Sequence, residues 1–190
     1  MRSIIGDLVW GTDDETMEKV VGDLLQEKGL TLATMESCTG GRLADLLTDV
    51  PGSSRYFKGG LVAYSNEMKV AFGVAPELIT QHGAVSSPVA EAMAVAASRC
   101  LGTDIGIGIT GVAGPEEIEG KPIGTVYIGI TDGTRTRSTR TIFPQHRQRI
   151  KLYAATGALS ELRRLLREAH YSPIDPNPPC PGNPRSQQSM

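Results

Sequence analysis

Strand-length apolar segments alternate with helix-length amphipathic segments along this chain, and this alternation constrains its fold more than any other feature. Strands that alternate with helices favour parallel pairing, whereas two late strands that meet at Asp132-Gly133 form a typical antiparallel hairpin. We therefore predict an α/β fold, a three-layer α/β/α sandwich around a mixed, mostly parallel sheet. The expected strands are 30–35, 57–64, 105–109, 123–131 and 134–143.

Capping residues and helix-period spacing mark the expected helices. Thr12 or Asp13 can cap the first helix, and Ser86 or Ser87 can cap an alanine-rich one. The expected helices are 12–28, 40–50, 66–72, 76–82, 86–101 and 145–170.

The chain divides into three parts by composition. Its 190 residues, 39% of them hydrophobic, suffice for the core of one domain, which we place at 12–170. Residues 1–11 carry no periodic signal and are expected to form an N-terminal arm. Six of the 12 prolines fall within 171–190, so we expect a Pro-rich disordered tail there.

Charge and cysteine usage exclude several classes of protein. With 19 Lys+Arg against 21 Asp+Glu, the net charge of -2 gives no drive toward nucleic acid or an anionic membrane. The three cysteines and three histidines are scattered, so we expect reduced thiols, no disulfide framework and no metal site. Because a secretory signal and an apolar run of about 20 residues are both missing, we expect a cytoplasmic protein that does not cross a membrane.

The first candidate site is a strand-to-helix turn between 30–35 and 40–50. A helix amino end offers free N–H groups, and paired glycines let a ligand approach the backbone, so an anion or oxyanion could sit here. A sharp turn also projects one side chain outward, which makes Ser37 or Cys38 a candidate nucleophile. The alternative is a helix cap with tight packing. The turn reads Glu36-Ser37-Cys38-Thr39-Gly40-Gly41-Arg42.

The second candidate site follows the strand 57–64. Lys69 lies about one helical turn from Ser65 and Asn66, so Lys69 and Tyr64 could face one cavity at the sheet edge. Burial lowers the pKa of a lysine, which can then serve as the base that a serine nucleophile needs. The alternative for Lys69 is an ordinary solvated helix lysine.

Two further segments are candidates for binding. Thr110-Gly111-Val112-Ala113-Gly114-Pro115 ends a strand, where α/β sheets form ligand crevices, and its small residues would admit a flat ring; a tight turn is the alternative. Residues 134–159 carry basic residues and no Asp or Glu. Arg147, near a helix start, could bind a phosphate, whereas Arg135 and Arg137 are expected on a solvated strand face.

Six segments with specific sequences occur in one order along the chain, and together they resemble a known family. They are Glu36-Ser37-Cys38-Thr39-Gly40-Gly41, Pro51-Gly52-Ser53-Ser54, Tyr64-Ser65-Asn66-Glu67 with Lys69, His82-Gly83-Ala84-Val85-Ser86, Thr110-Gly111-Val112-Ala113-Gly114-Pro115 and Lys121-Pro122-Ile123-Gly124-Thr125-Val126. In that order they resemble the C-terminal domain of the competence/damage-inducible protein CinA, which also occurs alone as nicotinamide mononucleotide deamidase. The resemblance runs from about residue 13 to 168.

The resemblance implies a mixed five-stranded sheet and an amidohydrolase of pyridine nucleotide salvage. The implied reaction converts nicotinamide mononucleotide and water to nicotinate mononucleotide and ammonia, without a metal or other cofactor. It implies that Ser37 attacks the carboxamide, that Lys69 is the base and that Tyr64 assists. The substrate-binding residues that we expect are Glu36, Thr39, Gly40, Gly41, Asn66, Thr110, Gly111, Ala113, Gly114 and Arg147.

Departures from the family pattern keep other functions open. Lys151 stands where the family has a second arginine, and the acidic loop 116–120 replaces Asp and a Gly pair. The chain could therefore be a weak or inactive paralogue that binds a nucleotide-like ligand or a protein partner, or an amidase for another carboxamide. We expect a stand-alone version without the family's larger nucleotide-hydrolysing domain. We also expect a homo-oligomer, because small enzymes often self-associate and the alanine-rich segment 90–97 can pack closely.

Overall fold

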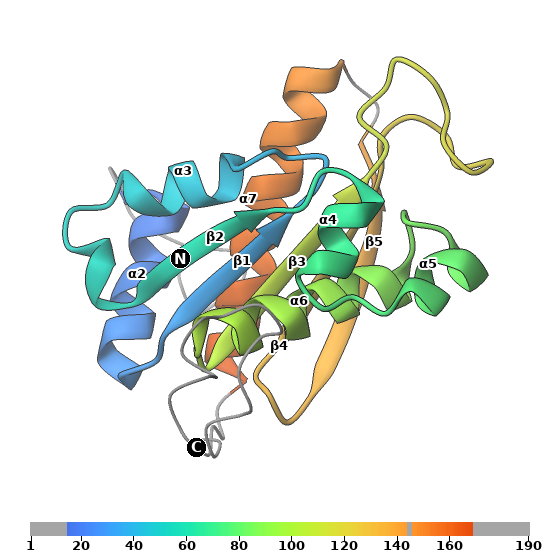
Figure 1. The fold of residues 1–190 in the computed structure, drawn as a ribbon. Helices are drawn as coiled ribbons and strands as arrows, with labels where there is room; N and C mark the ends of the chain where they lie inside the picture. Colours follow the sequence, from blue (N-terminus) through green and yellow to red (C-terminus); the bar gives the residue numbers. More distant parts are fainter. Residues whose placement is uncertain (1–14, 144–145, 169–190) are drawn as a thin grey trace, which may run out of the picture.

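One sheet of five strands, in the order β2-β1-β3-β4-β5, organises the computed structural model, which describes residues 15–143 and 146–168 (Figure 1). The pairs β2-β1 and β1-β3 are parallel, and β3-β4 and β4-β5 are antiparallel, so only β4 opposes the common strand direction. The prediction of a mixed five-stranded sheet is confirmed. The strands are β1 (Leu32–Glu36), β2 (Phe57–Val62), β3 (Ile105–Gly111), β4 (Thr125–Thr131) and β5 (Thr136–Ile142).

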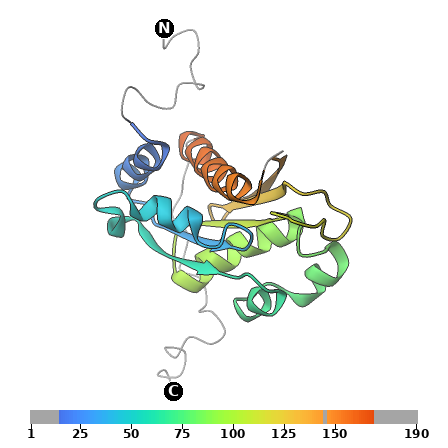
Figure 2. The same cartoon turned by 90° about the horizontal axis from the view of Figure 1, so that it is seen from above.

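Helices cover both faces of the sheet, which gives the predicted three layers (Figure 2). On one face, α2, α3 and α7 enclose the larger apolar core with the strands. On the other face, α6 packs on β3 and β4, and a second core lies beneath it. The helices are α2 (Met17–Lys28), α3 (Arg42–Thr48), α4 (Asn66–Ala71), α5 (Pro76–His82), α6 (Ser87–Leu101) and α7 (Arg147–Arg167), with a 3-10 turn, η2 (Ser53–Arg55).

Glycines in the strands let α6 approach the sheet closely. A Cβ atom on Gly108 would lie 2.3 Å from the Ala90 carbonyl oxygen, and one on Gly106 would lie 2.0 Å from that of Ala94. Ala90 and Ala94 are both fully buried in this contact. The alanine stripe is therefore used within the chain, so it gives no reason to expect self-association, and the homo-oligomer stays a prediction.

Some expected ends and surfaces differ in the structure. Helix α2 begins at Met17, and its cap is Thr16, whose Oγ1 accepts the Lys19 N–H at 3.4 Å. The expected caps Thr12 and Asp13 lie outside the described residues, as do the arm 1–11 and the tail 171–190. Ser86 does precede α6, but its hydroxyl donates to the Gly83 carbonyl instead of capping the helix.

Two expectations drawn from spacing and composition are wrong. Cys100 is disulfide-bonded, whereas reduced thiols were expected. The expectation failed because cysteines that are far apart in the sequence can still be close in the fold. Arg137 does not lie on a freely solvated face, since its Nη1 donates to Glu168 Oε2 at 2.6 Å. None of the helices in the described residues combines the length and apolar character needed to cross a bilayer.

Candidate functional site

The three neighbouring strands β2, β1 and β3 bring the candidate motifs to one edge of the sheet (Figure 1). Ser37, directly after β1, donates its backbone N–H to the Ile109 carbonyl of β3 at 2.9 Å. On the other side, Ala63 donates to the Glu36 carbonyl at 2.9 Å. The chain segments that follow β2, β1 and β3 therefore lie side by side, as expected for a ligand crevice at the carboxyl ends of strands.

The carboxylate of Glu36 fills the amino end of α3. Glu36 is 1% exposed, and its two oxygens accept the backbone N–H groups of Gly41, Leu43 and Ala44 at 3.1, 3.0 and 2.9 Å. A carboxylate is well suited to these N–H groups because a helix amino end carries partial positive charge. This corrects two expectations: the helix end is not open to a ligand anion, and the Glu36 side chain is not free to contact a substrate.

The turn between Ser37 and Gly41 is also partly committed to its own hydrogen bonds. Gly40 donates its N–H to the Ser37 carbonyl at 3.1 Å, so it is not the free oxyanion donor that the sequence suggested. Thr39 is fully buried, and in the described part of the chain its hydroxyl has no hydrogen-bond partner. Among the described residues the Thr39 backbone N–H donates to no other backbone group, so the turn can still offer it to a ligand.

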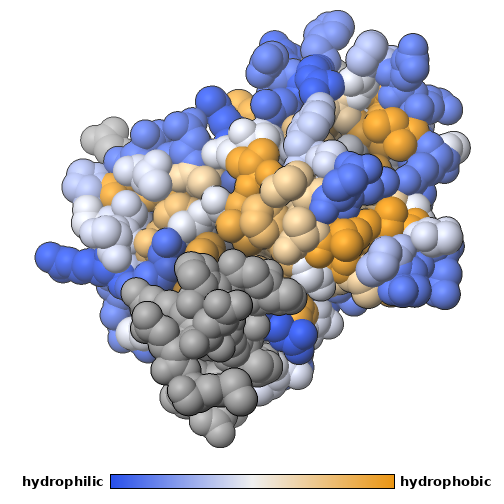
Figure 3. All heavy atoms as spheres, in the orientation of Figure 1, coloured by the Kyte–Doolittle hydropathy of each residue, from blue (hydrophilic) through white to orange (hydrophobic). Residues whose placement is uncertain are grey.

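Lys69 is the buried residue of an otherwise exposed helix. In α4, Met68 and Val70 are 40% and 39% exposed, whereas Lys69 is only 2% exposed. Hydrophobic side chains are exposed on the face of the molecule seen in Figure 3. The hydrophobic effect favours the opposite arrangement, in which Met68 and Val70 would be buried and the Lys69 ammonium would be exposed to water. The alternative of a solvated lysine is therefore wrong.

The surroundings of the Lys69 ammonium favour loss of its proton. Its Nζ donates to the carbonyl oxygens of Tyr64 and Ser65, each at a long 3.4 Å. Burial lowers the pKa of Lys69, although the negative charges of Glu119 and Glu67 partly oppose that effect. A lysine with a lowered pKa can act as a general base.

Cys38 lies beside Ser37 but is poorly suited to be a nucleophile. Its side chain is 6% exposed, and burial raises the pKa of its thiol to about 12. The charges of Lys69 and Lys151 act in the opposite direction, so both cations lie near this turn. Because a thiolate is the reactive form of cysteine, a protonated Cys38 favours Ser37 among the two candidates.

The amino end of α7 adds cations to the same edge. Arg147 Nη2 donates to the Tyr64 hydroxyl at 2.8 Å, and its Nη1 donates to the Gly114 carbonyl at 2.5 Å. The Lys151 Nζ lies 3.4 Å from where a Cβ atom on Gly40 would stand. The phenol of Tyr64 is thus directed to Arg147, and only its carbonyl meets Lys69.

The segment 110–114 lies over the turn, and its residues have different surroundings. The Thr110 hydroxyl donates to the Ala84 carbonyl at 2.8 Å. A Cβ atom on Gly111 would lie 3.1 Å from Cys38 Sγ, so this glycine faces the turn. Ala113 packs in the core, and Asn66 is exposed at the start of α4. The Ala113 side chain thus contributes to packing, and the assignment of Ala113 to substrate binding stays a prediction.

Glu119 joins the acidic loop to the connection between α5 and α6. Its carboxylate accepts the N–H groups of Ala84 and Val85 at 2.7 and 3.3 Å and pairs with Lys121 at 3.1 Å. Glu119 was not predicted from the sequence, because the backbone N–H groups that donate to it lie 34 and 35 residues away along the chain. The only sequence signal was the motif that contains Ala84 and Val85, to which no chemistry had been assigned.

No group of three or more His, Cys, Asp or Glu side chains among the described residues is arranged to hold a metal ion. The edge around Ser37 carries the cations Lys69, Lys151 and Arg147. This arrangement supplies a hydroxyl nucleophile, a buried amine and further cations. Such a set suits acyl chemistry on a substrate that carries negative charge.

The chain is similar in sequence to proteins of one known family. Residues 14–166 match the family model described as the CinA C-terminal domain. The chain is 51% identical over 169 residues to a putative competence-damage inducible protein of Moorella thermoacetica and 49% identical over 174 residues to a CinA-like protein of Synechocystis. Those matches cover 88% and 89% of this chain but only 41% and 42% of the relatives, so the chain spans about two fifths of their length.

Solved structures show the same fold. A CinA superfamily protein from Klebsiella pneumoniae has a TM-score of 0.78 at 30% identity, covering 82% of this chain and 100% of that one. A competence/damage inducible protein from Agrobacterium tumefaciens has a TM-score of 0.75 at 31% identity, covering 84% and 98%.

Proposed function

The chain belongs to the CinA C-terminal domain family, and on that premise we propose that it is an amidohydrolase acting on nicotinamide mononucleotide. The reaction releases ammonia from the carboxamide and leaves nicotinate mononucleotide, as part of pyridine nucleotide salvage in the cytoplasm. The observation that carries the proposal is the burial of Lys69, which lowers its pKa, at the same sheet edge as Ser37.

Ser37 and Lys69 divide the acyl chemistry between them. The neutral amine of Lys69 takes the proton of the Ser37 hydroxyl while Oγ bonds to the carboxamide carbon. The tetrahedral oxyanion that forms accepts the Thr39 backbone N–H. Lys69 then gives its proton to the amide nitrogen, the C–N bond breaks and ammonia leaves an acyl group on Ser37.

Water completes the cycle. It attacks the acyl carbon, Lys69 accepts its proton and Ser37 Oγ leaves with that proton, so both side chains return to their starting forms. In the substrate-free chain, Lys69 Nζ donates to two carbonyl oxygens and forms no hydrogen bond with Ser37 in the described residues. Catalytic hydrogen bonds commonly form only when substrate is bound.

Cations at the edge supply recognition of the nucleotide phosphate. Lys151 lies against Gly40 of the turn, and Arg147 lies between the Tyr64 phenol and the Gly114 carbonyl. A phosphate dianion offers Arg147 a stronger, charge-assisted acceptor than either neutral oxygen. We propose that these two cations bind the phosphate and that the segment from Thr110 to Gly114 borders the nicotinamide ring.

Ammonia release by the purified chain tests the proposal. Nicotinamide mononucleotide is compared with nicotinamide riboside and free nicotinamide, with Ser37→Ala as the control. Turnover of the mononucleotide alone, lost in the variant, supports the assignment. Binding of the mononucleotide without turnover would replace it with a non-catalytic paralogue, and turnover of another carboxamide would replace the substrate. Sedimentation velocity on the same sample tests the proposed homo-oligomer.

A further inference from the structure

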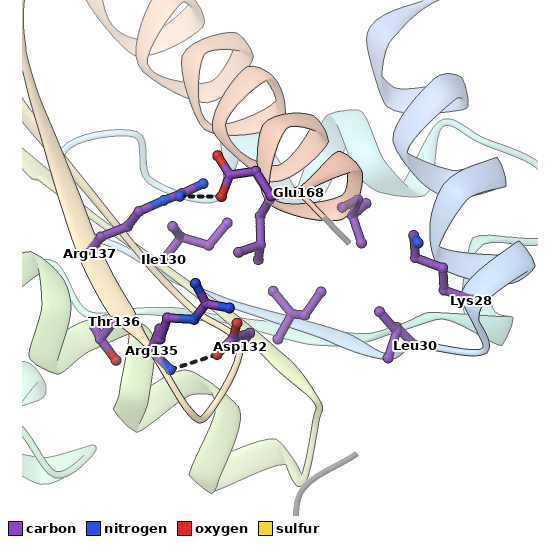
Figure 4. A pocket seen from close by; sticks show the side chains of 11 residues that line it. Lys28, Leu30, Ile130, Asp132, Arg135, Thr136, Arg137 and Glu168 are labelled. Atoms are coloured by element: carbon purple, nitrogen blue, oxygen red, sulfur yellow. Dashed lines mark hydrogen bonds and ion pairs between the residues drawn. The ribbon is translucent and has the colours of Figure 1, made fainter. Parts of the chain in front are cut away.

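A cavity of about 290 Å³ lies at the opposite edge of the sheet from Ser37 (Figure 4). It is bordered by residues at the amino ends of β1 and β3, by the β4–β5 hairpin and by the last turns of α2 and α7. Leu30 of this cavity precedes β1 and Ser37 follows it. At about 3.3 Å per residue along an extended chain, the two are roughly 20 Å apart. The cavity is therefore separate from the proposed catalytic edge.

The walls of the cavity combine apolar and charged side chains. Leu30, Ile105, Ile130 and Leu166 border it, and all four are buried in the larger core. The charged lining residues are three cations and two carboxylates. In Figure 4, Lys28 lies on one side of the cavity and Arg135 with the Arg137–Glu168 pair on the other. A ligand here would contact an aliphatic surface between charged groups.

Both carboxylates of the cavity are already bound. Glu168 accepts from Arg137 Nη1 at 2.6 Å. Asp132 Oδ1 accepts the backbone N–H groups of Thr134 and Arg135 at 2.9 and 2.7 Å, and the Thr134 hydroxyl at 2.7 Å, so it is committed to the hairpin turn.

Two cations of the cavity are not bound in this way. Among the described residues, neither the Lys28 ammonium nor the Arg135 guanidinium has a hydrogen bond or a salt bridge. The charge of Arg135 acts on both Asp132 and Glu168, but within the described residues no ion pair joins its guanidinium to either carboxylate. The cavity therefore offers a ligand two positive charges, those of Lys28 and Arg135, beside an apolar surface.

We propose that this cavity is a second binding site, for a small organic anion with a compact apolar body and one carboxylate. The aliphatic side chains contact the apolar body, and the carboxylate accepts hydrogen bonds from the Arg135 guanidinium with Lys28 as a second charge. Guanidinium groups bind planar carboxylates through paired hydrogen bonds, which selects for this ligand class. The volume is near the lower limit of about 300 Å³ for ligand pockets, so the ligand is limited to one or two rings.

Titration calorimetry with 2-naphthoate on the full chain tests the site, with 2-naphthylmethanol as the neutral probe of similar shape. The variant Lys28→Gln with Arg135→Gln removes both available charges, and Lys58→Gln removes an exposed charge on β2 as the matched control. We expect naphthoate to bind, the alcohol to bind at least fivefold more weakly and the double variant to raise the Kd at least tenfold. Lys58→Gln and Ser37→Ala should leave the Kd within about twofold.

Three results would overturn the proposal. They are absence of naphthoate binding, equal binding of the acid and the alcohol, and loss of binding in Ser37→Ala with retention in the double variant. Circular dichroism of each variant verifies folding, which is expected because Lys28 and Arg135 are both exposed residues. Because Ser37→Ala is included, failure here is distinguishable from failure of the proposed catalytic function.

Discussion

The Arg147 guanidinium donates to the Tyr64 hydroxyl at 2.8 Å and so joins the first turn of α7 to the segment after β2, 83 residues earlier in the chain. Its other terminal nitrogen binds the Gly114 carbonyl. One side chain thereby connects three segments around the candidate site. Because neither acceptor is charged, a substrate phosphate can compete for the same nitrogens.

Replacing Arg147 should weaken binding more than it slows chemistry. We expect Arg147→Gln to raise the KM for nicotinamide mononucleotide about tenfold while kcat changes less than about threefold, since a remote phosphate contact is made equally in the ground and transition states. Steady-state ammonia release measures both constants. Arg140→Gln, an exposed arginine on β5, is the matched control and should leave both unchanged. A fall in kcat with an unchanged KM would contradict the phosphate assignment.

The neighbouring residues Ser37 and Cys38 should respond differently to truncation. Ser37→Ala removes the attacking oxygen, so we expect kcat to fall about 10³-fold or more while the mononucleotide still binds within a few fold. Cys38→Ala removes a buried thiol whose pKa is about 12, and activity should stay within about fivefold. Single-turnover assays and calorimetric binding separate the two quantities. The reverse pattern would make Cys38 the nucleophile.

The elements of the fold could be predicted because their signals are local. Apolar periodicity, capping residues and turn residues located the described strands and α-helices, although not the 3-10 turn η2, and Gly29 ends α2 in the left-handed conformation that favours glycine. Ser37, Tyr64 and Thr110 were each expected at or near the end of a strand, and strand ends in an α/β sheet meet at one edge.

The partners of individual polar groups could not be predicted in this way. Glu36 folds back onto the amino end of α3, and nothing in its own sequence position distinguishes a helix cap from a substrate contact. The pairs Arg137–Glu168 and Glu119–Ala84 join residues 31 and 35 positions apart, and these depend on how the layers pack. Periodicity carries no information about such contacts.

The pH dependence of activity should reveal Lys69. Burial lowers the pKa of Lys69 from its ordinary value of 10.5, and the neutral amine is the active form. We therefore expect kcat/KM to rise with pH through an apparent pKa below 10.5 and then to level off. Lys69→Arg should lose nearly all activity at every pH, because arginine stays protonated. An unchanged pH profile in an active Lys69→Arg variant would exclude Lys69 as the base.

The close contact between α6 and the sheet predicts that adding one methyl group to a strand glycine will cause a large loss of stability. A Cβ atom on Gly108 would meet the Ala90 carbonyl oxygen at 2.3 Å and the Ala94 nitrogen at 2.6 Å, so Gly108→Ala should cost about 3 kcal/mol of unfolding free energy. In Gly157→Ala on α7, the new methyl group would meet the Ile128 side-chain terminus at 3.3 Å and the Phe143 ring at an ordinary contact distance of 3.8 Å. Because alanine has a higher helix propensity than glycine, this gain should offset the contact, and the unfolding free energy should stay within about 1 kcal/mol of the wild-type value. Urea unfolding measures both, and equal losses would contradict the close packing.

Lys69→Met should stabilise the chain while it abolishes activity. A buried ammonium with two long hydrogen bonds costs free energy that a methionine of similar length does not, so we expect a gain of about 1–2 kcal/mol at neutral pH. Because the folded-state pKa of Lys69 is below its unfolded value of 10.5, the cost is fully present below the folded pKa. It declines as pH rises from there toward 10.5. The gain should therefore shrink at high pH.

Urea unfolding of wild type and Lys69→Met across that pH range provides the measurement, with Lys58→Met on β2 as the exposed control. The control should change stability by less than about 0.5 kcal/mol at every pH, because an exposed lysine carries no burial cost. A destabilised Lys69→Met variant would show that the ammonium contributes to the fold. Burial of Lys69 would then carry no stability cost, so its burial would no longer be evidence for a catalytic role.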